Sequence, residues 1–385
     1  MRIVLTCNFS PWSAYRGGGQ VSTHRLATAL AGLGHDVHVV FTKAPFERVA
    51  APRDLPYGLT FAPFVAWRSR RDALLRPLNA LPVAMLVKRL AGMRRDAVVH
   101  SQGEEGVLVP DALPGVPWLL TPRYPSYPEE LDARTSLAQL SKLWLLHTKY
   151  MLLRKYAERA VFVCPTSQAA GRAIERALLV PSERIRVVPN GVEPAFTDVT
   201  RSVLASDAPL VFFGRMEATK GVDVLLDAYL ALRDAPPLVL IGEGAYAAHA
   251  EQRVRAAGAE ARIRLMPWQD SAELARWLAM ARCAVLPSRE ESFGNAMVEA
   301  MAAGTPLITT DVGALPEVTE RGALATLVPS GDARALQVAL DGLLADPQAA
   351  EERAVRARLS IGERYTWRAS AEAFVELYAS ALAAR

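Results

Sequence analysis

The chain has 385 residues, more than one hydrophobic core usually organises, so two domains are expected. Apolar residues make up 51% of the chain and charged residues 22%, which is typical of a globular protein and argues against a disordered one. The three cysteines lie in apolar runs without the spacing of metal ligands, which predicts small buried core residues and argues against a disulfide framework; they are Cys7, Cys164 and Cys283.

The charge is unevenly distributed along the chain. Residues 1–190 carry 25 Lys and Arg against 14 Asp and Glu, a net charge of +11, whereas the remaining residues carry 19 against 26, a net charge of −7. The first half is therefore expected to meet an anionic partner or surface.

The N-terminus, MRIVLTCNFSP, has too short an apolar run for a signal peptide and lacks a basic start and a cleavage site. No apolar window of about 18 residues is present that could span a bilayer. A cytoplasmic protein is expected.

The first half alternates short apolar strands with helices. Residues 2–11 predict a strand, residues 12–20 a glycine-rich loop, and residues 21–34 a helix with apolar residues at helical spacing. A second strand at residues 36–42 completes a βαβ unit, whose crossover is expected to be right-handed. Further strands are expected at residues 96–102, 116–122, 160–167 and 184–188.

A domain boundary is predicted after residue 195, because the turn Pro189-Asn190-Gly191 is followed by a polar segment up to Asp207. A second series of strands is expected at residues 209–216, 237–244, 263–268, 283–288, 306–311 and 324–330, with helical segments between them. The predicted domains are residues 1–195 and 196–366, followed by an amphipathic helix at residues 367–385 that is expected to pack back onto the first domain.

Two successive open α/β domains of this kind have parallel sheets and bind ligands beyond the carboxyl ends of their strands. The sequence therefore predicts an α/β protein of two Rossmann-like, doubly wound domains that face each other across a cleft.

The glycine-flanked loop at the carboxyl end of the strand predicted within residues 209–216 carries two cations. Arg215 and Lys220 are five residues apart, between Gly214 and Gly221. A guanidinium group can donate two parallel hydrogen bonds to phosphate oxygens and an ammonium group adds a point charge, so this loop suits a diphosphate. The alternative is an exposed turn with two solvated charges.

A second anion site is predicted within ESFGNAMVEAMAAGTP, residues 291–306. A helix that starts near Phe293 and Gly294 would present backbone N–H groups and the positive end of its dipole. Glu291, just outside that helix, could accept hydrogen bonds from sugar hydroxyls, and Glu299, in its second turn, could hold a ribose. The alternatives are a helix-terminal charge for Glu291 and a buried capping carboxylate for Glu299.

These stretches together resemble glycosyltransferase family 4, whose members are retaining enzymes of the GT-B fold with a Glu-x7-Glu motif. ESFGNAMVE matches that motif, and GRMEATKG precedes it by about 70 residues. The segments PTSQAA, VVPNGVEPAF, LIGEG and VLPS extend the resemblance over most of the chain.

The resemblance implies roles for single residues in the second domain. Arg215 and Lys220 would bind the diphosphate of a nucleoside-diphosphate sugar. The resemblance does not specify the base; UDP is expected rather than GDP. Glu291 would contact the transferred sugar and Glu299 the ribose. The other donor-binding positions would be the backbone of Phe293, Gly294 and Asn295, near the distal phosphate and the sugar, and Pro267 and Trp268, near the base.

In the first domain, Gly17, Gly18 and Gly19 match the family's glycine loop, which approaches the donor phosphates and the acceptor. Their spacing is not that of a dinucleotide fingerprint. His100 stands where the family has a catalytic histidine near the reacting sugar, and Gln102 occupies the place of a second histidine found in many members. The alternative for His100 is a structural residue at a strand end.

The resemblance implies transfer with retention of anomeric configuration, by a front-face attack in which the leaving phosphate takes the acceptor's proton. Arg215, Lys220 and the helix end would stabilise the leaving group, and Glu291 would position the sugar. No Asp-x-Asp pair stands where a metal would hold the diphosphate, so transfer without a metal or a cofactor is expected. The alternative is a nucleotide-sugar epimerase, a hydrolase or a non-catalytic nucleotide-sugar-binding subunit.

Residues 67–95 hold eight Lys and Arg against one Asp, with Leu, Val and Met interleaved. Such a segment can lie on an anionic leaflet, so a peripheral enzyme at the inner membrane face is expected, acting on a glycan or lipid-linked acceptor in cell-envelope polysaccharide or glycoconjugate synthesis. The alternative is a helix pair that covers the core with arginine stems. Nucleic acid is not expected, because no aromatic residues are interleaved with the basic ones. First-domain loops such as residues 121–136 are expected to read the acceptor.

Overall fold

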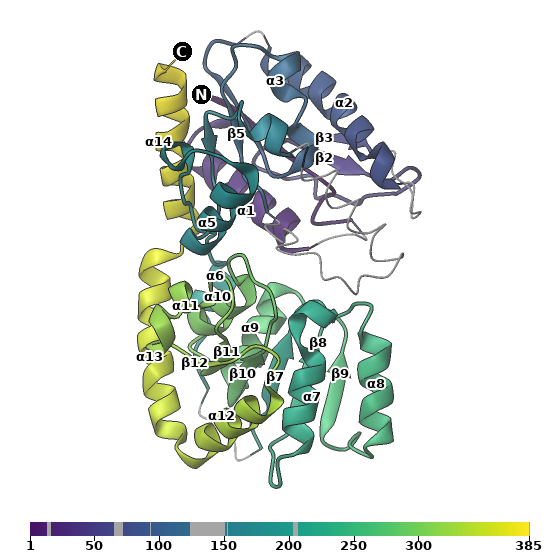
Figure 1. Ribbon diagram of the computed structural model, residues 1–385, viewed down its shortest axis with the longest axis vertical. Helices are drawn as coiled ribbons and strands as arrows, with labels where there is room; N and C mark the ends of the chain where they lie inside the picture. Colours follow the sequence, from purple (N-terminus) through teal and green to yellow (C-terminus); the bar gives the residue numbers. More distant parts are fainter. Residues whose placement is uncertain are drawn as a thin grey trace. The chain divides into compact units, whose positions relative to one another are not determined.

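The computed structural model describes residues 1–13, 17–64, 72–92, 94–123, 151, 153–202 and 207–384. The chain forms two compact units (Figure 1). Unit 1 comprises Met1–Gly191 and Trp367–Arg385, and unit 2 comprises Val192–Thr366. The sequence prediction had placed the first boundary after residue 195. Both ends of the chain therefore belong to unit 1, and the last helix is part of it.

Unit 1 is built on a sheet of six parallel strands in the order β3-β2-β1-β4-β5-β6. After β1 the chain adds β2 and β3 toward one edge of the sheet, and after β4 it adds β5 and β6 toward the other edge. The strand order therefore reverses between the two central strands, β1 and β4. The strands are β1 (Arg2–Cys7), β2 (Asp36–Lys43), β3 (Gly58–Pro63), β4 (Ala97–Ser101), β5 (Trp118–Leu120) and β6 (Phe162–Val163).

Alternation along the strands gives this sheet two apolar faces, as expected for a sheet covered on both sides. Val4 and Val99 point into one core, together with residues of the helices α2 and α5. Ile3 and Leu5 point into the other, together with residues of α1 and α14. The helical elements of unit 1 are α1 (Gly18–Gly32), α2 (Asp72–Ala91), η1 (Glu104–Gly106), α3 (Val109–Ala112), α5 (Gln168–Leu178), η2 (Ser182–Arg184) and α14 (Trp367–Ala383).

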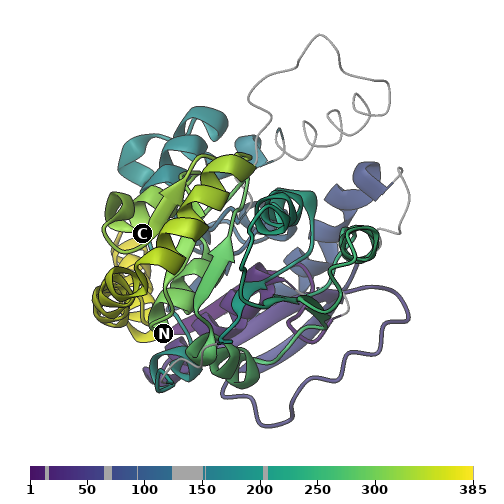
Figure 2. The same ribbon diagram turned by 90° about the horizontal axis from the view of Figure 1, so that it is seen from below.

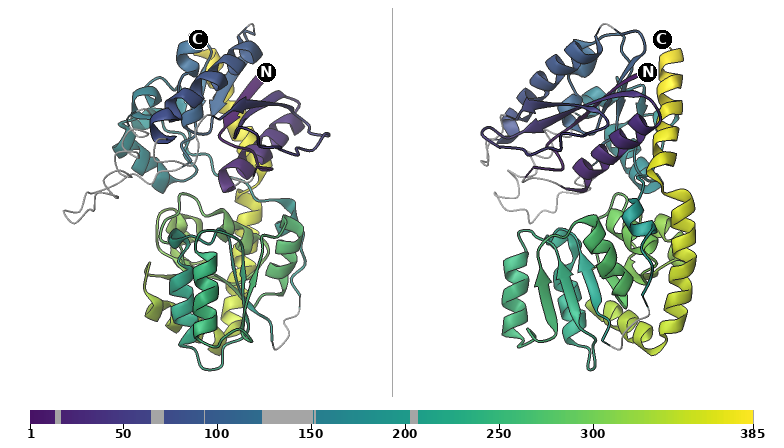
Figure 3. Two further views of the ribbon diagram at one scale, coloured as in Figure 1. Left: turned by 90° about the vertical axis from the view of Figure 1, so that its right-hand side faces the viewer. Right: turned by 180° about the vertical axis from the view of Figure 1, so that it is seen from behind.

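The last helix, α14, packs along α1 (Figure 3). Phe374 and Tyr378 lie one turn apart on its buried face, and their rings stack 5.9 Å apart. Phe374 also contacts the ring of His100, at 4.7 Å between centroids. The end of the chain thus completes the core that its first strand begins.

Unit 2 repeats the same architecture. Its six parallel strands have the order β12-β11-β10-β7-β8-β9, which reverses between β7 and β10. Helices cover both faces of this sheet (Figures 1 and 2). The strands are β7 (Leu210–Phe213), β8 (Leu238–Ile241), β9 (Ile263–Met266), β10 (Cys283–Leu286), β11 (Leu307–Thr310) and β12 (Thr326–Val328).

The helices of unit 2 form two groups by their contacts. α7 packs against α12, and α10 packs against α13. The helical elements are α6 (Pro194–Thr197), η3 (Ala218–Lys220), α7 (Val222–Leu230), α8 (Ala247–Ala256), α9 (Ser271–Met280), α10 (Asn295–Ala302), α11 (Leu315–Val318), η4 (Glu320–Gly322), α12 (Ala333–Ala345) and α13 (Pro347–Arg364).

The predicted α/β class with doubly wound parallel sheets is confirmed, and so is the burial of the three cysteines, all of which are free. None of the described helices combines the length and the apolar character needed to cross a bilayer. The prediction of a strand at residues 184–188 is wrong, and β3 was not predicted.

The segment 184–188 runs beside β6 but makes only a single bridge, between Ile185 and Val163. The N–H of Arg186 donates to the carbonyl of Val163, and that of Val188 to the carbonyl of Pro165. Pro165 has no N–H to return, so the ladder cannot continue. Proline in the neighbouring segment therefore stops a strand that the apolar pattern favours.

Replacing Phe374 by alanine should destabilise unit 1 by about 3–5 kcal/mol, because the ring is 5% exposed and would leave a cavity between α14 and the sheet. Amide hydrogen exchange of peptides from β1 and β4 should accelerate. Leu359→Ala, on α13 and 63% exposed, is the matched control and should change little. Unchanged exchange of unit 1 in Phe374→Ala would show that α14 does not support the core.

Candidate functional site

In unit 2 the two stretches singled out in the sequence follow neighbouring strands. β7 and β10 pair in parallel at the centre of the sheet, so the loops that follow them leave at the same edge. The loop at residues 214–221 follows β7, and the loop at residues 287–294 follows β10. Ligands of open α/β sheets bind at this kind of position, where the strand order reverses.

An ion pair joins these two loops. Lys220 Nζ lies 2.5 Å from Glu291 Oε1, and the hydroxyl of Ser288 donates to the same carboxylate oxygen at 3.0 Å. The side chains of Lys220 and Glu291 are 22% and 12% exposed. Two donors therefore hold the Glu291 carboxylate in place, close to the surface, and the structure brings these two predicted site residues together.

Arg289 fixes the geometry of both loops. Its guanidinium donates to both carboxylate oxygens of Asp223, at 2.8 and 2.6 Å, and to the carbonyl of Ala218. The backbone N–H of Arg289 donates to the carbonyl of Thr219. This hydrogen bonding lowers the pKa of the Asp223 carboxyl. Sequence reasoning missed this pair, which is 66 residues apart in the chain and has no local signal.

At Gly221 the backbones of the two loops lie close together. Its φ is +68°, and a Cβ there would lie 2.0 Å from the carbonyl oxygen of Pro287. Only glycine permits both the conformation and the contact.

The helix α10 begins at Asn295, just after the predicted start. Its N-cap is Gly294, with φ +91° and no side chain to cap the first N–H groups, and no acidic residue lies in the first turn. Phe293 is buried and packs edge-on against Tyr365. The positive end of the helix dipole is thus placed directly after the Glu291 loop.

Glu299 lies in the second turn of α10 and is partly buried. Burial raises the pKa of its carboxyl to about 8, and the charge of Glu193 adds to the increase. At neutral pH this carboxyl is largely protonated, whereas an ordinary glutamate is ionised.

Two further predicted residues lie at the same edge of the sheet but not in the ion pair. Arg215 donates to Glu217 at 2.9 Å and its side chain is 47% exposed. Trp268 follows the edge strand β9 and is 44% exposed. Strand β8 separates β9 from β7, so Trp268 lies away from the loop of Arg215 along the sheet edge.

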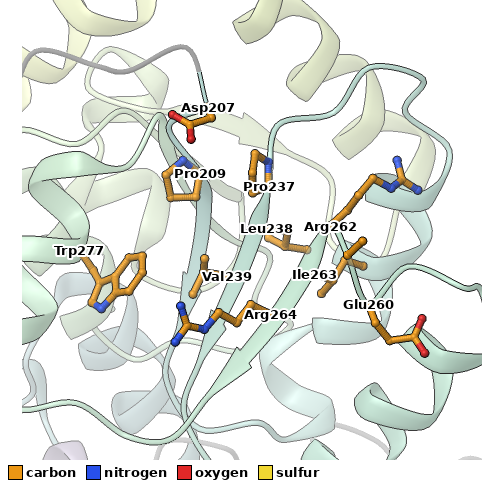
Figure 4. Close-up of a pocket in the computed structure, with 11 residues that line it drawn as sticks. Asp207, Pro209, Pro237, Leu238, Val239, Glu260, Arg262, Ile263, Arg264 and Trp277 are labelled. Atoms are coloured by element: carbon orange, nitrogen blue, oxygen red, sulfur yellow. The ribbon is translucent and has the colours of Figure 1, made fainter.

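A cavity of about 270 Å³ lies at the opposite edge (Figure 4). Pro209, Pro237 and Arg262, which immediately precede β7, β8 and β9, line it together with Trp277. None of the predicted site residues lines this cavity, and it lies at the amino ends of the strands, where open α/β sheets do not usually bind substrates.

In unit 1 the glycine segment lies at the corresponding edge, between β1 and α1. Gly17 is the extended N-cap of α1, and Gly18 and Gly19 are already in its first turn. The prediction of a loop of three glycines is therefore corrected, because only Gly17 precedes the helix. α1 has no acidic residue in its first turn.

His100 ends up in a fully buried position on β4. Its Nδ1 lies 2.7 Å from the hydroxyl of Tyr378 and its Nε2 lies 2.8 Å from the hydroxyl of Thr121. Burial, and then the charge of Arg123, lower the pKa of His100 to about 3. Both ring nitrogens have hydrogen-bond partners and the ring is neutral, so this geometry fits the structural alternative for His100.

Gln102 lies just beyond β4 and connects His100 to Arg123. Its Nε2 is 3.2 Å from His100 Nε2, and its Oε1 accepts a hydrogen bond from Arg123 Nη2. Sequence reasoning did not single out Arg123. The signal was present, because Arg123 follows a predicted strand in the same way that Arg215 does.

The raised pKa of Glu299 makes stability depend on pH. Between about pH 4.5, its ordinary value, and about pH 8, the folded chain binds this proton more tightly than the unfolded chain. The free energy of unfolding should therefore fall as pH rises through this window, by at most about 1.4 kcal/mol per pH unit. Glu299→Gln cannot titrate and should lose this component, as measured by urea unfolding at a series of pH values. Parallel curves for the variant and the wild type would contradict the assignment.

Two family models match the chain. The model described as Glycosyltransferase Family 4 matches residues 16–196, and the model described as Glycosyl transferases group 1 matches residues 208–346. Together they cover both units, including the β1–α1 segment of unit 1 and the loops after β7 and β10.

Characterised relatives align over nearly the whole chain. A phosphatidyl-myo-inositol mannosyltransferase of Mycobacterium leprae is 36% identical over 98% of this chain and 96% of its own length. A glycogen synthase of Mycobacterium tuberculosis is 28% identical over 99% of this chain and 95% of its own length. A D-inositol 3-phosphate glycosyltransferase of Segniliparus rotundus is 28% identical over 98% of this chain and 89% of its own.

Solved structures of glycosyltransferases share the fold. Sucrose-phosphate synthase from Thermosynechococcus elongatus superposes with a TM-score of 0.82 at 22% identity, over 100% of both chains. Anabaena Alr3699/HepE in complex with UDP gives a TM-score of 0.75 at 18% identity, over 99% of this chain and 100% of that one. The expectation of a GT-B fold is confirmed, and with the family models and the mannosyltransferase relative these matches show that the chain belongs to glycosyltransferase family 4.

Proposed function

We propose that this chain transfers a hexose from a nucleoside-diphosphate sugar to a hydroxyl group of a glycan, lipid-linked or small-molecule acceptor, with retention of anomeric configuration. The observation that carries the proposal is the Lys220–Glu291 pair, which lies beside the N-terminus of α10 at the strand-order reversal of unit 2. The cation and the helix N-terminus suit the phosphates of such a donor, and the carboxylate suits its sugar hydroxyls.

Donor binding would redistribute the ion pair. A diphosphate carries more negative charge than a carboxylate and would compete with Glu291 for Lys220. The exposed guanidinium of Arg215 would turn from Glu217 to bind the same diphosphate. Glu291, relieved of its partner, would then accept hydrogen bonds from the sugar. Glu299 would accept from the ribose hydroxyls, which requires its carboxyl to ionise on binding.

The chemical step needs the leaving diphosphate to be stabilised. Lys220, Arg215 and the N-terminus of α10 would supply positive charge there, without a metal or a cofactor. The acceptor's proton would pass to the leaving phosphate in a front-face attack. The neutral, hydrogen-bonded His100 is consistent with this route, because it leaves that position of unit 1 without a titrating base.

The choice of UDP as donor nucleotide is supported by Anabaena HepE, whose solved complexes contain UDP and UDP-glucose. The proposal covers several classes of acceptor, because the names of the relatives above imply different acceptors. They are a glycan for the glycogen synthase, and an inositol phosphate or a phosphatidyl-inositol for the others. Synthesis of cell-envelope polysaccharide or a glycoconjugate on the cytoplasmic side is the proposed setting.

A surface on α2 supports peripheral membrane binding. Leu78, Leu81 and Met85 are 53%, 53% and 65% exposed and lie on one helical face, and Lys88 and Arg89 are exposed in the last turn. The opposite face, with Val83 and Val87, is buried in the core. An apolar stripe that ends in two cations suits an anionic leaflet. Residues 67–71 and the side chains of residues 72–77, which hold the other half of the predicted basic segment's charges, lie outside the described residues.

Donor binding can be tested by thermal shift with UDP, GDP and ADP and their sugar conjugates. A ligand at about 100 times its dissociation constant adds roughly 2.7 kcal/mol of stability. UDP should raise the melting temperature of the wild type, and Lys220→Ala should lose most of that rise.

The matched control is Arg276→Ala, which removes an exposed cation of unit 2 on α9 that pairs with Glu273. It should keep the full response to UDP. The anomeric configuration of a transferred sugar, read from the proton NMR spectrum of the product, tests retention. If no diphosphate stabilises the wild type, the chain does not act on nucleotide sugars.

Membrane binding can be tested by flotation with vesicles of anionic lipid at low salt. The wild type should float with the vesicles. Replacing Leu81 and Met85 by serine should leave it in the soluble fraction, because the exposed stripe would no longer enter the interface.

The control for this surface is Leu359→Ser, a substitution of an apolar residue that is 63% exposed on α13. It should float as the wild type does. A wild type that stays soluble with anionic vesicles at low salt would exclude the membrane proposal and leave the transferase proposal intact.

A further inference from the structure

The loop that carries Glu291 is held along one side by strand β11. β10 and β11 pair in parallel, so the segments that follow them leave the sheet at the same edge (Figure 1). Thr309 Oγ1 donates to the carbonyl of Leu286 at 2.7 Å, at the end of the ladder. Thr310 Oγ1 donates to the carbonyl of Ser288 at 2.5 Å. The side chains of β11 therefore hold the chain of β10 beyond the point where the strand pairing ends.

The turn after β11 holds the same loop at its other end. The backbone N–H of Ala314 donates to the carbonyl of Glu291 at 3.2 Å. Gly313 has φ +54°, and a Cβ there would lie 1.9 Å from that carbonyl oxygen. An alanine at this position would strain its own backbone and push the backbone of Glu291 away. The loop after β10 is thus anchored at both Ser288 and Glu291 by the chain of β11.

Ser288 connects this anchoring to the Glu291 carboxylate. Its carbonyl accepts from Thr310, and its hydroxyl donates to Glu291 Oε1, the oxygen that also contacts Lys220. Thr310 and Ser288 are 1% and 2% exposed, so this hydrogen bond is shielded from water and costly to lose. Without the Thr310 hydroxyl, Ser288 should shift, and the carboxylate that it holds should shift with it.

We propose that Thr310 and Gly313 are positioning residues for Glu291. They fix the backbone of residues 288–291, so that the carboxylate meets Lys220 in the ligand-free chain and the sugar of the donor once a donor is bound. Small displacements of a group that contacts the substrate weaken its hydrogen bonds steeply. The inference rests on the proposed function, in which Glu291 accepts hydrogen bonds from the transferred sugar.

The first test compares UDP-glucose with UDP, because Glu291 would contact the sugar and not the nucleotide. Dissociation constants of both ligands are measured by titration calorimetry. Thr310→Val removes the hydroxyl and should raise the dissociation constant of UDP-glucose, relative to that of UDP, about threefold or more, the loss expected when one hydrogen bond is weakened. Thr310→Ser keeps a hydroxyl and should restore the wild-type ratio.

Thr305→Val is the matched control. Thr305 is 0% exposed and donates in the same way, but to the carbonyl of Leu278 on α9, at 2.8 Å. It precedes β11 and so lies at the amino end of the strand, opposite the site. This variant should lower the melting temperature but leave the ratio of dissociation constants unchanged. A ratio that changes equally in Thr305→Val and Thr310→Val would reflect a general loss of structure and overturn the inference.

A double variant separates positioning from stability. If Thr310 acts through the Glu291 carboxylate, Thr310→Val should change the ratio little in a chain that already carries Glu291→Ala. An undiminished effect of Thr310→Val in that chain would contradict the proposal, because the hydroxyl would then act by another route.

Gly313→Ala tests the second anchor, with Gly258→Ala as its control. Gly258 has φ +59°, so alanine meets the same backbone strain there, but among the described residues its Cβ would find only its own chain neighbours within 4 Å. Gly313→Ala should raise the ratio of dissociation constants and Gly258→Ala should not. The same ratio in both variants would remove Gly313 from the proposal.

Failure of the proposed function can be told apart from failure of this inference. A wild type that does not bind UDP contradicts the proposed function, whereas binding of UDP without UDP-glucose leaves that function standing with another sugar. In either case the ligand-free chain decides, by urea unfolding of Thr310→Val, Lys220→Ala and the double variant. If Thr310 supports the Lys220–Glu291 pair, the double variant should lose less stability than the sum of the single losses. Additive losses would overturn the inference.

Discussion

A parallel sheet whose strand order reverses sends the chain in opposite directions beyond two neighbouring strands, and so opens space between their loops. Both units obey this constraint, at β1 and β4 in unit 1 and at β7 and β10 in unit 2. In unit 2 the loops that follow these strands carry Lys220 and Glu291, and in unit 1 the corresponding segments carry Gly19 and Gln102.

The two edges differ in their electrostatics. At the edge of unit 2 a lysine and a glutamate compensate each other, and an anionic ligand has to replace one partner. At the edge of unit 1 the histidine is neutral, its neighbour Gln102 cannot titrate, and Arg123 contacts the side-chain amides of Gln102 and Asn190. The proposed transfer reaction, in which the leaving phosphate acts as the base, would require positive charge and fixed dipoles.

Helix α14 contributes both to the core of unit 1 and to the surroundings of His100. Tyr378, on the last helix, contacts Nδ1 of a histidine 278 residues earlier, and Gln102 contacts Nε2 of the same ring. Phe374 packs on the same ring. Helix α14 therefore packs behind the carboxyl end of β4. A substitution on the buried face of α14 should alter the position of His100.

Local patterns in the sequence were enough to predict most strands, the two doubly wound domains, and the residues that follow β7 and β10, because apolar runs, turn residues and motif spacing are short-range properties. They failed where a neighbour decided the outcome: Pro165 ends the ladder that residues 184–188 would join. The spacing Glu-x7-Glu marked Glu291 and Glu299 but could not show that one is paired with Lys220 and the other carries a raised pKa. The neutrality of His100 and the placement of Arg123 were likewise decided by tertiary structure, since hydrogen-bond partners and desolvation come from residues far away in the chain.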